Sequence, residues 1–271
     1  MSVTKLLARI VAPEMSVEDG LTLHDHTYGI TSDPLTQFAC ILASIIHDVD
    51  HRGVPNTQLI KESQSLAVAY HGKSVAEQNS VEIAWSLLME DEFTDLRRTI
   101  YVNKEEFLRF RSLVVNAVMA TDIMDKELGK ARKDRWNKAF SDIASEEPRR
   151  QGINRKATIV IEHLIQASDV SHTMQHWHIY RKWNEKFFRE CFKAYKDGRA
   201  EKDPSLDWYE GELGFFDFYI IPLAKKLKMC GVFGVSSDEY LNYAINNRSE
   251  WERRGREVVA EMLESFHAKY K

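Results

Sequence analysis

The sequence predicts an all-α protein, and three observations carry that prediction. The chain has only 12 glycines and 6 prolines in 271 residues, about half the usual share, so it lacks the turn-forming residues that many short strands need. Apolar residues recur at helical spacing over long stretches, and no stretch shows the alternation typical of a strand. Hydrophobic residues make up 44% of the chain, enough for a large core. We therefore expect one compact multi-helix domain over residues 1–271.

The elements follow from apolar periodicity and from end signals. Residues 2–12 place apolar side chains on one helical face. Asp33-Pro34 supplies an N-cap followed by a proline at the first helical position, which begins a helix that runs to about Asp48. Ser74-Val-Ala-Glu77 has the spacing of a capping box that opens another helix. Further helices are expected at 63–70, 104–122, 128–145, 153–171, 175–197, 207–228 and 237–269.

Composition excludes several classes of function. The 37 Lys and Arg against 41 Asp and Glu leave a formal charge of −4, so we expect no nucleic-acid partner. The longest uncharged run, Pro34–Ile46, is too short to span a bilayer, so we expect no membrane segment in the chain. Three widely spaced cysteines suggest no disulfide framework and favour a reducing compartment. We expect a cytoplasmic location, or the cytosolic face of a larger membrane protein.

The sharpest chemical feature is the run His47-Asp48-Val-Asp50-His51 at the end of an apolar helix. Unpaired charge at the edge of a core is costly, and a bound cation would relieve that cost. His47 and His51 are four residues apart and share a helical face, while Asp48 adds an oxygen ligand. The run predicts a metal site; the alternative is a hydrogen-bonded polar cluster that ends the helix.

Two other apolar helices end in comparable groups. Asp169 closes the mostly apolar run that begins at Ala157, and a carboxylate at a helix C-terminus is unfavourable unless something compensates its charge. Asp169 is therefore the best candidate for a further metal ligand, with a simple turn residue as the alternative. Thr121-Asp122 repeats the pattern after another apolar run. This pair either supports the metal ligands from outside or simply forms a turn.

Together these segments resemble the class I 3′,5′-cyclic nucleotide phosphodiesterase catalytic domain. A His-Asp pair alone marks a much wider hydrolase superfamily, whereas the ordered set of motifs over residues 33–228 is specific. The motifs that carry the resemblance are His47–Asn56, Ser74–Glu77, Ala120–Asp122, Ala167–Ser171, Tyr180–Trp183 and Gly214–Pro222.

The resemblance implies a compact all-helical domain with two divalent metal ions, zinc and magnesium or manganese. Asp48 matches the position that bridges the ions, and His47 and Asp169 match ligands of the tighter one. Two such ions polarise the phosphodiester and lower the pKa of a bound water. The residues that match positions around the second ion's waters and the phosphate are His51, Glu77 and Thr121.

The resemblance also implies a base-binding subsite. Phe215 matches the aromatic that stacks on the base, and Phe187 falls on the opposite side of the clamp. Glu212 stands where the purine-reading glutamine is expected; its alternative is an ion pair with a nearby Lys or Arg. Tyr180 and Trp183 match positions in the pocket wall, with ordinary core packing as the alternative. His172 stands at a position where asparagine is common.

One departure from the family matters most. The family has a His-Asn-x-x-His-Ala motif shortly before the helix that matches residues 2–12, and this chain lacks that motif. Its two histidines normally supply the acid that protonates the leaving group and a metal ligand. Residues 78–80 read Gln-Asn-Ser where Asn-His-His is common. Truncation, a naturally degenerate relative, and replacement by His24 and His26 would each explain the departure, and truncation is our first expectation.

Two functions follow as expectations. The first is an enzyme that hydrolyses cyclic AMP, cyclic GMP or both to the nucleoside 5′-monophosphate, with impaired turnover because the upstream histidines are absent. The second is a catalytically silent, metal-containing module that binds cyclic nucleotide or a protein partner. Regulatory domains upstream of the chain fit either expectation.

Overall fold

The computed structural model describes residues 2–10, 23–140 and 149–269, and in these ranges every regular element is a helix. The expected all-α class is therefore confirmed. The elements are α1 (Ser2–Leu7), α2 (Leu23–His26), α3 (Pro34–Ile46), α4 (Asn56–Glu62), α5 (Gln64–Ala69), α6 (Val75–Leu88), η2 (Asp91–Phe93), α7 (Thr94–Ile100), α8 (Lys104–Met119), α9 (Lys126–Phe140), α10 (Arg149–Asp169), η3 (Ser171–Met174), α11 (Trp177–Lys196), η4 (Pro204–Leu206), α12 (Trp208–Phe215), η5 (Phe216–Ile220), α13 (Ile221–Met229) and α14 (Val235–Lys269).

The long helices agree with the sequence expectations, and α3 begins as expected, with the Asp33 side chain accepting a hydrogen bond from the Leu35 amide. The prediction of a capping box at Ser74 is wrong, although α6 does begin at the next residue, Val75. Ser74 takes a left-handed φ of 39° and makes no side-chain cap, because its hydroxyl instead donates a 2.7 Å hydrogen bond to Asp122. Residues 11–12 and 141–145 of two expected helices lie outside the described residues.

The helix expected at 207–228 is interrupted by a π-helical turn, η5. Pro222 lies in the first turn of α13 and has no N–H to give to the carbonyl four residues earlier. The Ile221 amide bonds to the Phe216 carbonyl, five residues back, which widens the helix locally. The short helices α4 and α7 were not expected from the sequence.

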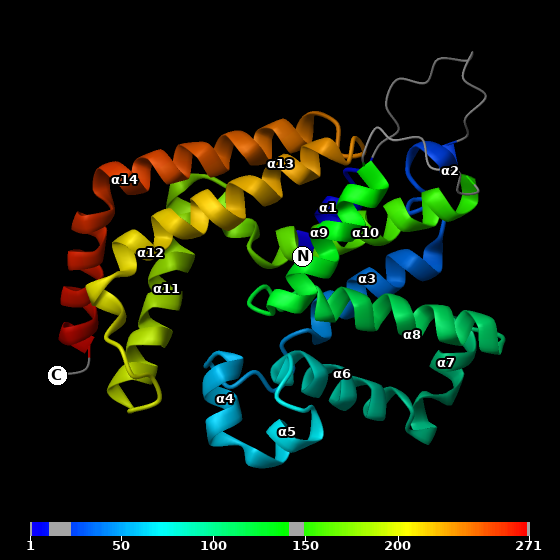
Figure 1. Ribbon diagram of the computed structural model, residues 1–271, viewed down its shortest axis with the longest axis horizontal. Coiled ribbons are helices and arrows are strands. Elements are labelled where there is room, and N and C mark those ends of the chain that lie inside the picture. Colours follow the sequence, from blue (N-terminus) through cyan, green and yellow to red (C-terminus); the bar gives the residue numbers. More distant parts are fainter. Residues whose placement is uncertain (1, 11–22, 141–148, 270–271) are drawn as a thin grey trace.

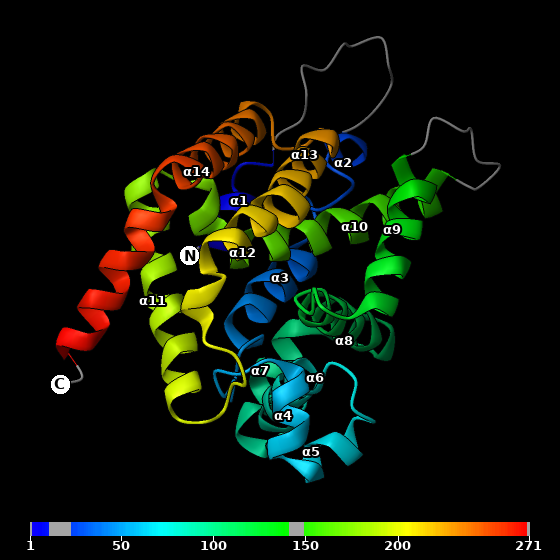
Figure 2. The same ribbon diagram turned by 60° about the vertical axis from the view of Figure 1, so that its left-hand side comes forward.

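The helix α3 lies at the centre of the arrangement, packed against α8, α10 and α1 (Figure 1). The long pair of α13 and α14 runs along one edge, and α4, α5 and α6 group at the opposite end in both views (Figure 2). Most buried apolar residues form one core that includes Ala43 of α3, Val114 of α8 and Leu164 of α10. Among the described helices, none combines the length and apolar character needed to cross a bilayer.

Candidate active site

Two buried helices end at the same place and bring three ligand-type side chains together. His47 and Asp48 follow the last residue of α3, and Asp169 is the last residue of α10. The Nε2 atom of His47 lies 3.4 Å from Oδ2 of Asp48 and 3.4 Å from Oδ1 of Asp169. The ligand atoms of all three lie within 4.8 Å of one another. The structure therefore assembles the three side chains that the sequence offered as metal ligands.

The His47 ring is oriented by its own helix. Its backbone amide continues the helix to the Ala43 carbonyl, and its Nδ1 lies 3.1 Å from the Ser44 carbonyl. A backbone partner at Nδ1 fixes the tautomer that leaves Nε2 free to act as a ligand. Nε2 is buried and faces the two carboxylate oxygens at 3.4 Å without making a well-formed hydrogen bond, an arrangement that coordination of a cation would relieve.

The electrostatics of the cluster favour a cation. The Asp169 carboxylate makes the largest contribution to raising the pKa of His47 to about 9, with Asp48 adding to it and burial opposing it. A side chain that holds a proton this strongly is surrounded by negative charge. One imidazole nitrogen and two carboxylates suit a divalent ion such as zinc, so the residues present fit the metal centre that the family resemblance implies.

A second network surrounds the start of α6. The Asn56 side chain donates to Glu77 at 2.9 Å and to Asp122 at 3.5 Å, and its oxygen accepts from the Ala76 amide at 2.9 Å. Burial raises the pKa of Glu77 and the Asp122 carboxylate adds to that rise, whereas the hydrogen bond from Asn56 and the electrostatic influence of His51 lower it. Glu77 and His51 thus belong to one electrostatic neighbourhood. Sequence reasoning assigned no role to Asn56, although it lies inside a motif that carries the resemblance.

Thr121 and His51 are held by backbone groups. The Thr121 hydroxyl donates to the Val118 carbonyl at 2.7 Å, so the lone pairs of its oxygen remain for a water or an ion. The exposed His51 accepts a 3.3 Å hydrogen bond at Nδ1 from the Gly53 amide.

The residues at 78–80 support the turn after α3. Asn79 donates to Asp50 at 3.2 Å, and the Ser80 hydroxyl donates to the Val49 carbonyl at 2.8 Å. Gln78 instead bonds to the Lys73 carbonyl at 2.6 Å. Two of these three departures from the common Asn-His-His pattern therefore attach α6 to the turn that carries Asp48.

Glu212 is buried and has neutral partners. Tyr180 donates to its Oε2 at 2.6 Å, and a hydrogen bond with Asn184 also acts on the carboxyl. Burial is the largest influence and raises the pKa of Glu212 to about 7. The alternative of an ion pair with Lys or Arg is not what the structure shows. Asn184 in turn accepts from the Trp208 indole at 3.2 Å, a contact that the sequence analysis missed because a mid-helix asparagine gives no signal.

The aromatic residues expected around the base differ in accessibility. Tyr180 has no exposed surface, so it cannot contact a base directly and could influence base binding only through its hydrogen bond to Glu212. Trp183 and Phe187 are 48% and 55% exposed and lie four residues apart on α11, so they are available to a ligand.

Phe215 and His172 are partly buried against other rings. Phe215 stacks on Tyr219 of η5 with ring centroids 5.4 Å apart. The His172 ring lies nearly parallel to that of Tyr180, with 6.5 Å between centroids, and burial lowers the pKa of His172. Both rings are thus held by neighbours whether or not a base is present.

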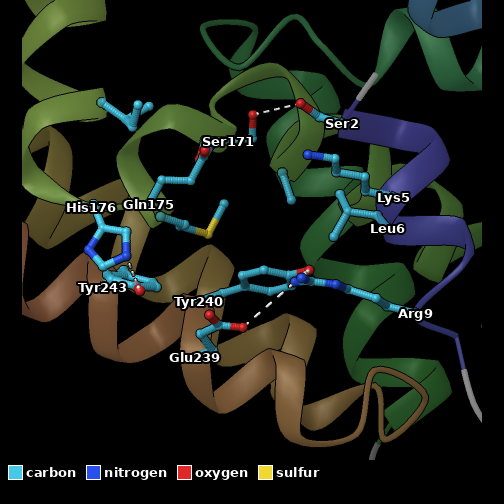
Figure 3. Close-up of a pocket in the computed structure, with 13 residues that line it drawn as sticks. Ser2, Lys5, Leu6, Arg9, Ser171, Gln175, His176, Glu239, Tyr240 and Tyr243 are labelled. Atoms are coloured by element: carbon cyan, nitrogen blue, oxygen red, sulfur yellow. Dashed lines mark hydrogen bonds and ion pairs between the residues drawn. The ribbon is translucent and has the colours of Figure 1, made fainter.

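A separate cavity of about 380 Å³ lies between α1, η3 and α14, and none of the three clustered ligands lines it. Figure 3 shows that its polar side chains face one another: Arg9 bonds to the Tyr240 hydroxyl at 2.6 Å, and Ser2 bonds to Ser171 at 2.9 Å. His176 similarly lies 2.9 Å from the Tyr243 hydroxyl. Each of these groups thus has at least one hydrogen-bond partner within the protein.

The fold and the cluster define a class: an all-helical domain with a candidate metal centre where two helices end. The family model described as 3′5′-cyclic nucleotide phosphodiesterase matches residues 21–232. The chain belongs to this family, which confirms the resemblance found in the sequence.

Individual relatives agree with this membership. The dual specificity calcium/calmodulin-dependent 3′,5′-cyclic nucleotide phosphodiesterase 1B of Bos taurus is 25% identical over 198 residues, covering 68% of this chain and 33% of that protein. The probable 3′,5′-cyclic-AMP phosphodiesterase pde-4 of Caenorhabditis elegans is 26% identical over 200 residues, 70% of this chain and 29% of its own length. The chain thus spans about a third of these relatives.

The fold is also found among solved structures. The phosphodiesterase domain of the Salpingoeca rosetta rhodopsin phosphodiesterase superposes with a TM-score of 0.66 at 19% identity, covering 97% of this chain and 83% of that one. At this identity the likeness concerns the fold.

Proposed function

We propose that the protein hydrolyses a 3′,5′-cyclic nucleotide to the nucleoside 5′-monophosphate at a two-metal site, as a single catalytic domain over residues 1–271. The observation that carries the proposal is the cluster of His47, Asp48 and Asp169, in which the buried Nε2 of the histidine faces both carboxylates, in a chain of the cyclic nucleotide phosphodiesterase family. The relatives compared above are named as enzymes that act on cyclic nucleotides.

In this proposal His47 and Asp169 would hold the tighter ion, zinc, and Asp48 would serve as a ligand both of that ion and of a second one, magnesium or manganese. When bound, the ions would supply Lewis acidity for the phosphodiester and for a water at neutral pH. The chain's own contribution is to fix the ligands on the ends of two rigid helices. Glu77, Thr121 and His51 would orient the waters and the phosphate around the second ion; Glu77 is held by Asn56, and Thr121 and His51 are held by backbone groups.

The base is proposed to stack on Phe215, with Phe187 on the opposite side and Trp183 and His172 along the wall. Glu212 faces the purine edge, and Tyr180 supports it through the 2.6 Å hydrogen bond. The accessible rings of Trp183 and Phe187 are the observation that favours this side of α11. All three cysteines are free, which supports the expected cytoplasmic location.

A catalytically silent binding module is the second candidate. It is favoured by residues 78–80, which read Gln-Asn-Ser where the resemblance implies Asn-His-His. Two imidazoles that could transfer protons are thereby lost, and general acid catalysis contributes about 10²–10⁴-fold to a rate. For the module we therefore expect slow turnover or none.

The test is an assay of cyclic AMP and cyclic GMP hydrolysis with Zn²⁺, Mg²⁺ or Mn²⁺, alongside a direct binding measurement. Imidazole added to the buffer can replace a missing histidine, so slow turnover that rises with imidazole and vanishes in Asp48→Asn supports the enzyme. Binding of cyclic nucleotide without any turnover, with or without imidazole, supports the module. A protein that shows no cyclic nucleotide binding and no turnover would contradict both the enzyme and the module.

A further inference from the structure

The turn between α3 and α4, residues 47–55, carries Asp48 and His51 and is irregular. Asp50 and Gly53 have left-handed φ values of 62° and 68°. One side of the turn is held by α6, through the hydrogen bonds to Asp50 and Val49 described above. A turn that presents metal ligands needs support on its other side as well, because coordination geometry tolerates little displacement.

Arg199 supplies that support from the connection after α11. Its guanidinium donates a 3.0 Å hydrogen bond to the carbonyl of Arg52, the residue that follows His51. The same guanidinium makes a two-pronged pair with Glu62 at the end of α4, with Nε to Oε1 at 2.9 Å and a terminal nitrogen to Oε2 at 2.7 Å. One side chain thus joins the turn, α4 and the end of α11.

The backbone of Arg199 is itself fixed. The Arg199 amide bonds to the Ala194 carbonyl at 2.8 Å and the Gly198 amide bonds to Tyr195 at 3.0 Å, with Gly198 at a φ of 73°. This is the Schellman pattern that ends many helices. Ala194 is buried in a small cluster with Val54 at the end of the turn. The guanidinium therefore extends from a rigid base and not from a free loop.

A close contact with α11 leaves the turn little room. A Cβ at Gly53 would lie 3.1 Å from Oε1 of Glu190 on α11. The peptide group between Arg52 and Gly53 is consequently packed against α11 on one face, and its carbonyl accepts the hydrogen bond from Arg199. Gly53 also donates its amide to Nδ1 of His51, so the same peptide group sets the orientation of the imidazole.

We propose that Arg199 is a positioning residue for the metal site, which acts by holding the peptide that follows His51 in the orientation needed for metal binding. The inference rests on the proposed function in that it assumes a metal at this turn. It adds a residue from a distant part of the chain, and it links the end of α11, the helix of Trp183 and Phe187, to the turn that carries the metal ligands.

The structure offers a matched control. Lys61 of α4 and Glu201 of the same connection form a 2.7 Å ion pair. This pair joins the same two elements as the Arg199 pair, but no contact with the turn is found for it among the described residues. The Lys61 and Glu201 side chains are 61% and 87% exposed, and such pairs contribute little to stability. Lys61→Met therefore removes a link between these elements without touching the metal-site peptide.

The experiment compares wild type, Arg199→Ala, Arg199→Lys and Lys61→Met in two measurements on the full chain. The first is a calorimetric titration with Zn²⁺ or Mn²⁺ alone, which measures metal affinity. The second is hydrogen exchange of the amides of residues 51–54 in metal-free protein. We expect Arg199→Ala to weaken metal binding about tenfold, the lower end of the range for residues that support ligands, and to speed exchange at these amides. Arg199→Lys should fall short of wild type because lysine lacks the planar fork.

The outcomes separate this inference from the proposed function. Equal metal affinity and equal exchange in Arg199→Ala and wild type would overturn the inference. Equal losses of metal affinity in Arg199→Ala and Lys61→Met would also overturn the inference. Such losses would show that any link between α4 and the connection after α11 has the same effect. If wild type binds no metal, the proposed two-metal function fails and the inference as stated fails with it, while faster exchange in Arg199→Ala alone would still show that Arg199 orders the turn.

Discussion

The hydroxyl of Tyr180 donates a 2.6 Å hydrogen bond to Oε2 of Glu212, and both side chains are buried between α11 and α12. Their hydrogen bond satisfies one carboxyl oxygen but brings no positive charge. Burial therefore dominates, and it raises the pKa of Glu212 to about 7. A carboxyl group at this position changes charge near neutral pH, which has consequences for stability and for nucleotide binding.

We expect Glu212→Gln to stabilise the protein at pH 8. Because the folded-state pKa is raised, the folded protein binds the Glu212 proton more tightly than the unfolded chain does. Stability from this group is fully present below its ordinary pKa of 4.5 and is lost as pH rises through about 7. A shift of this size corresponds to about 3 kcal/mol, and a glutamine keeps an oxygen for the Tyr180 hydroxyl without paying for a buried charge.

The measurement is the free energy of unfolding in urea at pH 4.5 and pH 8. The gain should be large at pH 8 and close to zero at pH 4.5. Glu210→Gln is the matched control, because Glu210 lies on the same helix but is exposed and pairs with Arg256. The same gain at both pH values, or a gain as large in the control, would mean that Glu212 does not titrate as described.

Glu212 should also make nucleotide preference depend on pH. An ionised carboxylate only accepts hydrogen bonds, which suits the N1–H and N2 amino donors of guanine and opposes the N1 acceptor of adenine. Tyr180 occupies one position on Oε2, so we expect a preference for cyclic GMP near the lower end of the roughly 1–3 kcal/mol that a good base contact contributes. Below about pH 7 the protonated group can also donate, and the preference should narrow.

Competition binding of cyclic GMP and cyclic AMP at pH 6 and pH 8.5 checks this expectation, with Glu212→Gln as the variant that cannot titrate. Selectivity in Glu212→Gln should be the same at both pH values. A wild-type preference for cyclic AMP at pH 8.5 would show that Glu212 does not read the base.

The sequence was a good guide where a single interaction dominates and a poor one where several compete. Apolar periodicity located the long helices, and the polar ends of α3 and α10 located His47 and Asp169, because stranded charge is a local signal. Ser74 was misread because its hydroxyl had a choice between the helix amides and Asp122, which lies 48 residues away. Arg199 gave no signal, since its importance comes from contacts with Arg52 and Glu62 that only the folded chain creates.

Removing a carboxylate of the cluster should remove the metal. We expect the metal content of purified protein to fall sharply in Asp48→Ala and Asp169→Ala, because each takes a charged ligand from a site with few ligands. Asp50→Asn is the control: Asp50 pairs with Asn79 and Arg52, and asparagine tolerates its left-handed φ of 62°. Elemental analysis measures the result, and equal content in all three variants would refute the ligand assignment.

Metal binding should release a proton from His47 at neutral pH. Asp169, with help from Asp48, raises the pKa of His47 to about 9 in the absence of metal. A histidine must be neutral to serve as a ligand, so below about pH 9 each binding event displaces its proton. The apparent affinity should then rise about tenfold per pH unit up to pH 9. The stability of the metal-free protein should depend on pH in the opposite direction to the metal affinity. The contribution of protonated His47 to the free energy of unfolding is fully present below its ordinary pKa of 6.5 and is lost as pH rises through about 9.

Calorimetric titration with Zn²⁺ at pH 7, in buffers of different ionisation enthalpy, counts the protons released. About one proton is expected from wild type. The control Asp50→Asn keeps His47, Asp48 and Asp169 and should release the same number of protons as wild type. Release of no proton by wild type at pH 7 would contradict this prediction, because a histidine that coordinates a metal and has a pKa well above 7 must give up its proton on binding.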